Sequence, residues 1–111
     1  MNDKDYFCGC PSPEPEVLPI SGKEADEKLA SLAKALAHPA RVQILRILAR
    51  RKACMCGDIV SEMALSQSTV SEHLRILKDA GAIIGEVDGP RVCYCINRPV
   101  LDYFKSLVNG L

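Results

Sequence analysis

Residues 57–80, GDIVSEMALSQSTVSEHLRILKDA, predict two helices joined by a tight turn. In the second half, Val70, Leu74 and Leu77 recur at positions i, i+4 and i+7, a spacing that puts apolar side chains on one stripe of a helix. The remaining positions carry mainly short hydrogen-bonding side chains. Such a polar face suits contacts with base edges in the major groove of DNA, whereas the alternative is an ordinary amphipathic surface helix.

The first half of this stretch predicts a shorter helix. Ile59, Val60 and Met63 fall on one helical stripe, and Asp58 is placed to cap its start. Gly81 is the expected stop after the second helix. The whole stretch therefore predicts a helix-turn-helix.

Composition and charge limit what the protein can be. The chain has 111 residues and no net charge, and none of its apolar runs approaches the roughly 20 residues of a membrane span. With a polar, acidic N-terminus, this predicts one cytoplasmic domain without a membrane partner. Residues 28–57 contain seven basic and no acidic groups. The block from Lys28 to Lys52 is therefore the candidate phosphate-facing side, the alternative being the solvated faces of ordinary helices.

Six cysteines stand out in so short a chain. In a secreted protein they would suggest disulfides, which the expected cytoplasmic compartment disfavours. They fall into three Cys-x-Cys pairs, which points to soft-metal ligation or redox sensing by thiolates. The pairs are Cys8 and Cys10, Cys54 and Cys56, and Cys93 and Cys95.

The N-terminal half divides into an arm and two helices. Residues 1–20 contain four prolines among acidic residues and predict an extended arm, followed by one domain over residues 21–111. Ser21 and Glu24 match a capping box that starts a helix ending near His38. Pro39 then suits the first turn of a second helix over about residues 39–50.

The C-terminal half predicts a hairpin and a last helix. Strands over residues 83–87 and 91–96 flank an Asp-Gly-Pro turn, with Tyr94 and Ile96 on one face of the second strand and the cysteines on the other. Pro99 opens a helix that runs to about Val108. The order of elements predicts a mainly α fold with a small β-hairpin: a winged helix-turn-helix, dimeric through its flanking helices.

Three segments carry a resemblance to a known family. Residues 36–42, LAHPARV, residues 65–74, LSQSTVSEHL, and the Cys-x-Cys before the helix-turn-helix are similar to the ArsR/SmtB family of metal- and metalloid-responsive repressors. The resemblance covers about residues 25–105. It implies a homodimer that binds double-stranded, pseudo-palindromic operator DNA and releases it when a thiophilic ion binds.

The resemblance also implies which residues contact DNA. Two-fold symmetry would place the recognition helices, residues 67–79, in successive major grooves. His73 has the alternative role of a half-buried structural histidine. Arg75 is an expected phosphate contact, and Arg91, beside the turn of the wing, is expected to touch the DNA backbone or the minor groove. The expected base or phosphate contacts are Gln67, Ser68, Thr69, Ser71 and His73.

The resemblance implies two kinds of ion site. Family members that sense cadmium or lead pair arm cysteines with the later Cys-x-Cys, whereas arsenite sensing needs three thiolates, drawn either from this Cys-x-Cys region or from the arm plus one of its residues. In this sequence the cadmium- or lead-binding cysteines would be Cys8, Cys10, Cys54 and Cys56. The arm cysteines of one subunit would then meet the Cys-x-Cys of the other. Gly57 departs from the commonest family pattern here. A Cys-x-Cys inside a regular helix separates its side chains by about 200°, so Cys54 and Cys56 chelate jointly only at a helix start or in irregular backbone.

The third cysteine pair is a further candidate. Cys93 and Cys95 share one face of a strand about 7 Å apart and can share a soft ion if the strand bends or another thiolate approaches. The alternative is two small residues packed under the sheet.

An all-sulfur donor set favours soft ions. As(III) or Sb(III) is the preferred inducer and Cd(II) or Pb(II) the alternative, while a zinc sensor is disfavoured. A thiol-redox-sensing repressor is a second alternative. The chain lacks Cys-x-x-Cys and nucleotide-binding glycine motifs, so an enzyme is not predicted.

Overall fold

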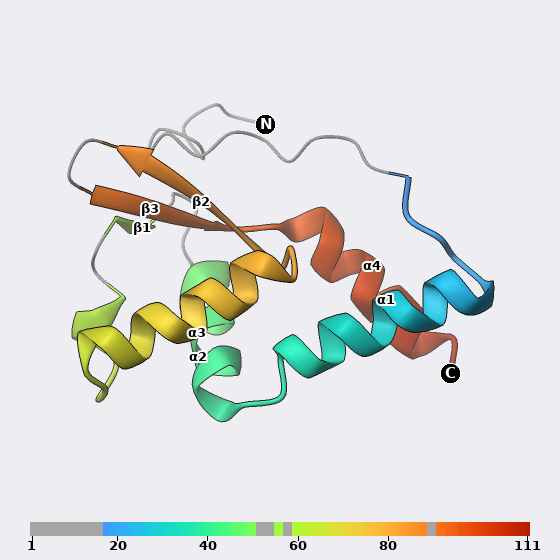
Figure 1. The fold of residues 1–111 in the computed structure, drawn as a ribbon, viewed down its shortest axis with the longest axis horizontal. Helices are drawn as coiled ribbons and strands as arrows, with labels where there is room; N and C mark the ends of the chain where they lie inside the picture. Colours follow the sequence, from blue (N-terminus) through green and yellow to red (C-terminus); the bar gives the residue numbers. More distant parts are fainter. Residues whose placement is uncertain (1–16, 51–54, 57–58, 89–90) are drawn as a thin grey trace.

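The computed structural model describes residues 17–50, 55–56, 59–88 and 91–111. Over these residues the chain is a winged helix-turn-helix, as the sequence predicts (Figure 1). The helices are α1 (Gly22–Ala35), α2 (Pro39–Arg50), the 3-10 helix η2 (Val60–Glu62), α3 (Gln67–Asp79) and α4 (Arg98–Asn109). The strands are β1 (Met55–Cys56), β2 (Ile83–Asp88) and β3 (Arg91–Ile96).

The boundary between α1 and α2 follows from Pro39. The α2 helix begins at this proline as predicted, and Nδ1 of His38 accepts a hydrogen bond from the Ala40 N–H at 3.0 Å. The α1 helix ends at Ala35 rather than near His38, because a proline disfavours helical geometry in the residue before it and the chain must turn first.

The predicted capping box at the start of α1 is wrong. Ser21 is the N-cap residue, but its side chain makes no capping hydrogen bond. Gly22, the next residue, has a φ of 87°, outside the helical region, so the serine side chain is not aligned with the first turn.

The first helix of the predicted helix-turn-helix is a single 3-10 turn, η2. Strand β1 extends to Cys56 and Ser66 already caps α3, so only residues 57–65 remain between them. Ile59 and Met63 are nevertheless buried, as the predicted stripe requires.

The core lies between the α2–α3 pair and one face of the sheet. Leu77 from α3, Ile44 from α2 and Ile83 from β2 belong to one buried cluster, and Tyr94 and Ile96 of β3 pack against it. Tyr94 and Ile96 therefore share one face of β3, as predicted, and that face is the one turned towards the core. Alternation along the strand puts Cys93 and Cys95 on the opposite face.

The sheet has three strands in the order β1-β3-β2, all antiparallel. The sequence predicts only the β2–β3 hairpin, because a strand of two residues carries no recognisable pattern. Strand β1 pairs with the side of β3 that faces away from β2. In this pairing Met55 is opposite Tyr94 and Cys56 is opposite Cys93.

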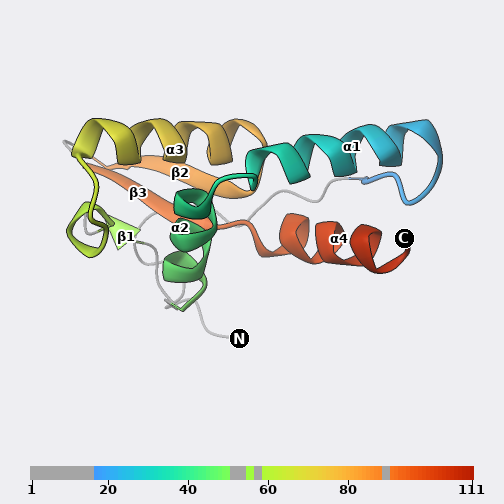
Figure 2. The same cartoon turned by 90° about the horizontal axis from the view of Figure 1, so that it is seen from below.

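Helices α1 and α4 lie side by side and extend away from the sheet (Figures 1 and 2). Asn97 caps α4, its side chain accepting from the Val100 N–H, so this helix begins slightly earlier than predicted. The Tyr103 hydroxyl of α4 donates to the Pro19 carbonyl, which ties the segment before α1 to this pair. No described helix has the length and apolarity needed to cross a bilayer.

Replacing Gly81 by Ala is expected to lower the free energy of unfolding by about 1–2 kcal/mol. Gly81 has a φ of 87°, and no atom lies within 4 Å of a Cβ built there, so the cost is that of the left-handed backbone. Gly110→Ala is the matched control, since Gly110 also follows a helix but has an ordinary φ of −82°. Urea unfolding of both variants measures the difference, and equal losses would contradict this explanation.

Candidate DNA-binding surface and thiolate site

The start of α3 is fixed by Ser66. Its hydroxyl oxygen accepts from the Thr69 N–H at 3.3 Å, the hydrogen bond of a regular N-cap. The same hydroxyl donates to Thr69 Oγ1 at 2.9 Å and lies 3.3 Å from Ser68 Oγ. The first turn of α3 therefore presents a cluster of hydroxyl groups at the positive end of the helix dipole, where phosphate groups bind favourably.

Four predicted DNA contacts lie together on the exposed side of α3. They are Gln67, Ser68, Thr69 and Ser71. Val70, Leu74 and Leu77 of the same helix are buried, against the core. The polar face predicted from the sequence is therefore present and accessible.

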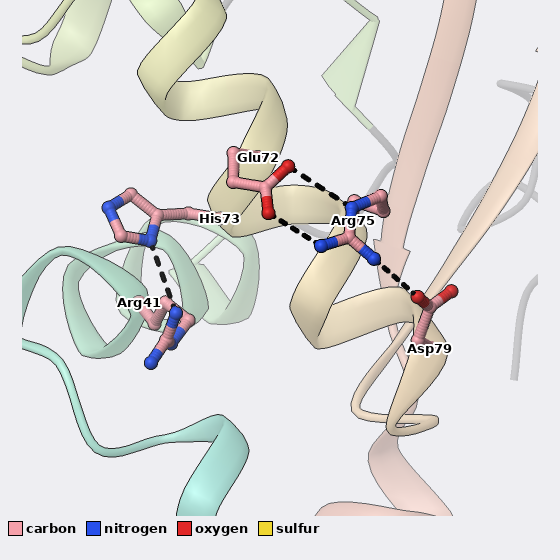
Figure 3. A network of polar contacts seen from close by, with 5 residues as sticks. All are labelled: Arg41, Glu72, His73, Arg75 and Asp79. Carbon is pink, nitrogen blue, oxygen red and sulfur yellow. Dashed lines mark hydrogen bonds and ion pairs between the residues drawn. The ribbon is translucent and has the colours of Figure 1, made fainter.

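Arg75, the fifth predicted contact on α3, already has two partners. Its guanidinium donates to both carboxylate oxygens of Glu72 and, at 2.9 Å, to Asp79 (Figure 3). The Arg75 hydrogen bond holds the pKa of Glu72 below its ordinary value. The Arg75 side chain is 58% exposed, so it is available to a phosphate that competes with these carboxylates.

His73 lies on the buried side of α3, and the structure supports its alternative, structural role. Only 9% of the residue is exposed, and its ring stacks at a tilt on that of His38, with centroids 4.4 Å apart. Nη1 of Arg41 in α2 lies 3.4 Å from His73 Nδ1 (Figure 3). Enclosure of this side chain favours the structural role of His73 over a contact with base edges.

Acidification is expected to destabilise the protein through His73. Burial lowers the pKa of His73, and the neighbouring His38 and Arg41 lower it further. The unfolded chain therefore binds this proton more readily, so stability is full above about pH 6.5 and is lost as the pH falls towards the native pKa. Urea midpoints between pH 7.5 and pH 5 measure the slope. The His73→Gln variant should show a flatter dependence of stability on pH than the control variant His38→Gln. An unchanged slope in His73→Gln would contradict the assignment of this pH dependence to His73.

The basic block makes contacts within the protein. Besides Arg41, which faces His73, Arg50 at the end of α2 lies 3.7 Å from Glu62 of η2. Arg91 is the first residue of β3, opposite Asp88, next to the turn of the wing as predicted. The side chain of Arg91 lies outside the part described.

One cysteine from each of two Cys-x-Cys pairs meets in the register of the sheet. Cys56 is opposite Cys93, and Glu86 of β2 is opposite Cys93 on its other side. Cys93 is fully buried although it lies outside the main core cluster, and Cys95 is half-buried. Both Cys93 and Cys95 are disulfide-bonded, contrary to the expectation from the compartment.

The other predicted ion ligands, Cys8, Cys10 and Cys54, lie outside the described residues. Within the described side chains, no three His, Cys, Asp or Glu groups form a metal site. The sequence analysis did not predict that Cys56 lies opposite Cys93. The only signal in the sequence was that each of these cysteines belongs to a Cys-x-Cys pair.

Comparison with known proteins agrees with this geometry. Residues 38–84 match the family model described as bacterial regulatory protein, arsR family. The HTH-type transcriptional repressor SmtB of Mycobacterium tuberculosis is 35% identical over 81% of this chain. The chain spans 63% of the length of that repressor. The arsenical resistance operon repressor of Staphylococcus xylosus is 31% identical over 72% of this chain and 76% of its own.

A solved structure supports the same assignment. The homodimeric winged helix-turn-helix DNA-binding domain of Mb0332 from Mycobacterium bovis superposes with a TM-score of 0.64 at 30% identity, covering 81% of this chain and 84% of that one. These relatives are regulators of transcription rather than enzymes. The chain belongs to the ArsR/SmtB family of winged helix-turn-helix transcriptional regulators.

Proposed function

We propose that the protein is a transcriptional repressor that binds operator DNA as a homodimer and releases it when cysteine thiolates bind a thiophilic ion. The observation that carries the proposal is the first half of α3. Gln67, Ser68, Thr69 and Ser71 are exposed together on a helix that Ser66 caps and whose other side is anchored in the core. Such a helix has the side chains and the access that major-groove contacts need.

The α1–α4 pair supports the dimer. Leu29 of α1 and Phe104 and Leu107 of α4 are only half-buried in one chain, and Val108 is 44% exposed. A second copy would cover this apolar surface, and the relative from Mycobacterium bovis is homodimeric. A two-fold dimer would present two copies of α3 to successive major grooves.

The preferred inducer is As(III) or Sb(III), with Cd(II) or Pb(II) as the alternative. Clustered thiolates suit these soft ions, and one relative is an arsenical resistance repressor. Free thiolates persist in a reducing compartment, so we expect the protein to act in the cytoplasm.

The disulfide bonds at Cys93 and Cys95 favour a second candidate function, a repressor that senses oxidants. In that reaction two thiols give two electrons and two protons to a peroxide, which becomes two molecules of water, while one S–S bond forms. Release from DNA by peroxide without any added ion would distinguish this candidate.

The repressor proposal is tested by fluorescence-anisotropy titration on duplex DNA from upstream of the gene, with a shuffled duplex as control. Specific binding is expected to be roughly 10³-fold or more tighter than binding to the shuffled duplex and to weaken steeply with salt. Sedimentation of the protein alone should show a dimer. Equal affinity for both duplexes at every salt concentration would reject the proposal.

A further inference from the structure

An arginine on the exposed side of α3 is held between two carboxylates, and we call Glu72, Arg75 and Asp79 the Arg75 triad. The Arg75 guanidinium donates to both carboxylate oxygens of Glu72, from Nε at 3.1 Å and from Nη2. Its Nη1 donates to Oδ2 of Asp79 at 2.9 Å (Figure 3). All three residues are exposed and follow one another at a spacing of one helical turn, so they form one polar cluster on the surface.

The triad lies opposite the side of α3 that packs on the core. Each residue of an α-helix turns the chain by about 100°, so Arg75 lies about 200° around the helix from the buried Leu77. Ser68, an exposed residue that we propose to contact DNA, lies about 20° from Arg75 and about 10 Å earlier along the axis. A groove that receives Ser68 therefore also faces the long side chain of Arg75.

The triad leaves two donors of the guanidinium available. Arginine has five N–H donors, one on Nε and two on each terminal nitrogen. Three of them donate to Glu72 and Asp79, so one N–H on Nη1 and one on Nη2 have no partner among the described residues. In the major groove guanine presents two neighbouring acceptors, O6 and N7, whereas adenine presents a donor beside N7. Among the four bases, only guanine accepts from both N–H groups.

The charge of the triad disfavours a phosphate as the partner of Arg75. The Arg75 hydrogen bond lowers the pKa of Glu72, so this carboxylate is ionised at neutral pH. Two carboxylates and one guanidinium then give the triad one net negative charge. A phosphate would meet this like charge, whereas the O6 and N7 edge of guanine has no net charge. The triad therefore favours a base edge over the phosphate that the sequence predicts.

On the basis of the repressor function proposed above, we propose that Arg75 reads one guanine in each half of the operator and that Glu72 and Asp79 are positioning residues for this contact. A contact with a base edge specifies sequence, whereas a phosphate contact only positions the protein. The carboxylates restrict the arginine before DNA arrives, so less side-chain entropy is lost on binding. They also repel DNA without this guanine, which raises specificity.

The first test is anisotropy titration of the full reduced chain on duplex DNA from upstream of the gene and on a shuffled duplex. Arg75→Ala should weaken binding to the upstream duplex by at least about 5-fold, within the 5- to 150-fold that one bidentate pair is worth. Binding to the shuffled duplex, and the slope of log K against log salt concentration, should stay at the wild-type values. Arg75→Lys should not restore affinity, because lysine keeps the charge but lacks the planar fork.

A second test locates the guanine. Dimethyl sulfate methylates N7 of guanine, so methylation at the contacted base should block binding of the wild type. The same methylation should have no effect on Arg75→Ala, which has already lost the contact. Replacing that guanine by 7-deazaguanine, which keeps Watson–Crick pairing, should give the same result. The loss caused by the base and the loss caused by the variant are then not additive, as expected of two groups in direct contact.

The positioning role is tested with Glu72→Gln/Asp79→Asn, which keeps the shape of both side chains and removes their charge. This variant should bind the shuffled duplex more tightly, with a steeper salt slope, because the released guanidinium can then contact phosphate. Lys105→Ala, which removes an exposed positive charge from α4, is the control and should leave both affinities unchanged. Circular dichroism checks that every variant folds.

Two outcomes would overturn the proposal. One is an equal loss of affinity on both duplexes in Arg75→Ala, with a salt slope shallower by about 2, since the dimer would then lose one phosphate contact per subunit. The other is wild-type affinity of Arg75→Ala for the upstream duplex. Equal binding of the wild-type protein to both duplexes would instead reject the repressor function itself, before any variant is measured.

Discussion

A protein carrying both Gln67→Ala and Ser71→Ala should bind its operator about 100-fold or more weakly, with an unfolding free energy within about 0.5 kcal/mol of the wild type. Both residues are exposed, and at spacing i, i+4 they are neighbours on the surface of α3. One good base contact is worth about 1–3 kcal/mol, and a dimer loses each contact twice.

Anisotropy titration measures the affinity, and urea unfolding measures the stability. Ser31→Ala, an exposed serine on α1, is the control and should leave both unchanged. Unchanged operator affinity in the double variant would show that this face of α3 does not contact DNA.

Leu77→Ala is expected to lower the free energy of unfolding by about 2–5 kcal/mol, a large share of the 5–15 kcal/mol typical of a small domain. The Leu77 residue is 0% exposed and belongs to the cluster that holds α3 against α2 and β2. The truncation removes apolar contacts and leaves a cavity beneath the recognition helix, so DNA binding should weaken as well.

Leu111→Ala is the matched control for this prediction, since Leu111 is 93% exposed and should tolerate the same truncation within about 0.5 kcal/mol. Denaturant unfolding compares the two variants. A loss below about 1 kcal/mol for Leu77→Ala would contradict the packing described here.

Most of the fold could be predicted because strong local signals coincide with the tertiary structure. Pro39 fixes the start of α2, the Val70–Leu77 stripe predicts α3, and Gly81 ends it in a left-handed conformation. Two hydrogen bonds of a Schellman motif, from the Gly81 and Ala82 N–H groups to the carbonyls of Lys78 and Leu77, accompany that glycine.

Strand β1 could not be predicted, because its two residues are ordered by pairing with β3, a contact that leaves no local pattern. The helix predicted to follow Asp58 is reduced to the short η2 helix. That Cys56 lies opposite Cys93 could therefore be seen only from the register of the strands.

The position of His73 could have been predicted from helical spacing. It lies three residues after Val70 and four before Leu77, so it falls beside the apolar stripe of α3. Helical spacing does not reveal which residue contacts the buried His73 ring nitrogen. That residue is Arg41 on α2, with the ring of His38 beside it.

The proposed function requires that a thiophilic ion release this protein from DNA. The most direct measurement is the fluorescence anisotropy of labelled operator DNA bound to the reduced protein while arsenite is added. We predict that anisotropy falls to that of free DNA at about one arsenic per subunit, because an affinity coupling of about 1–3 kcal/mol lowers operator binding 5- to 150-fold. Anisotropy that stays at the bound value after the ultraviolet sulfur-to-arsenic charge-transfer band has saturated would contradict this prediction.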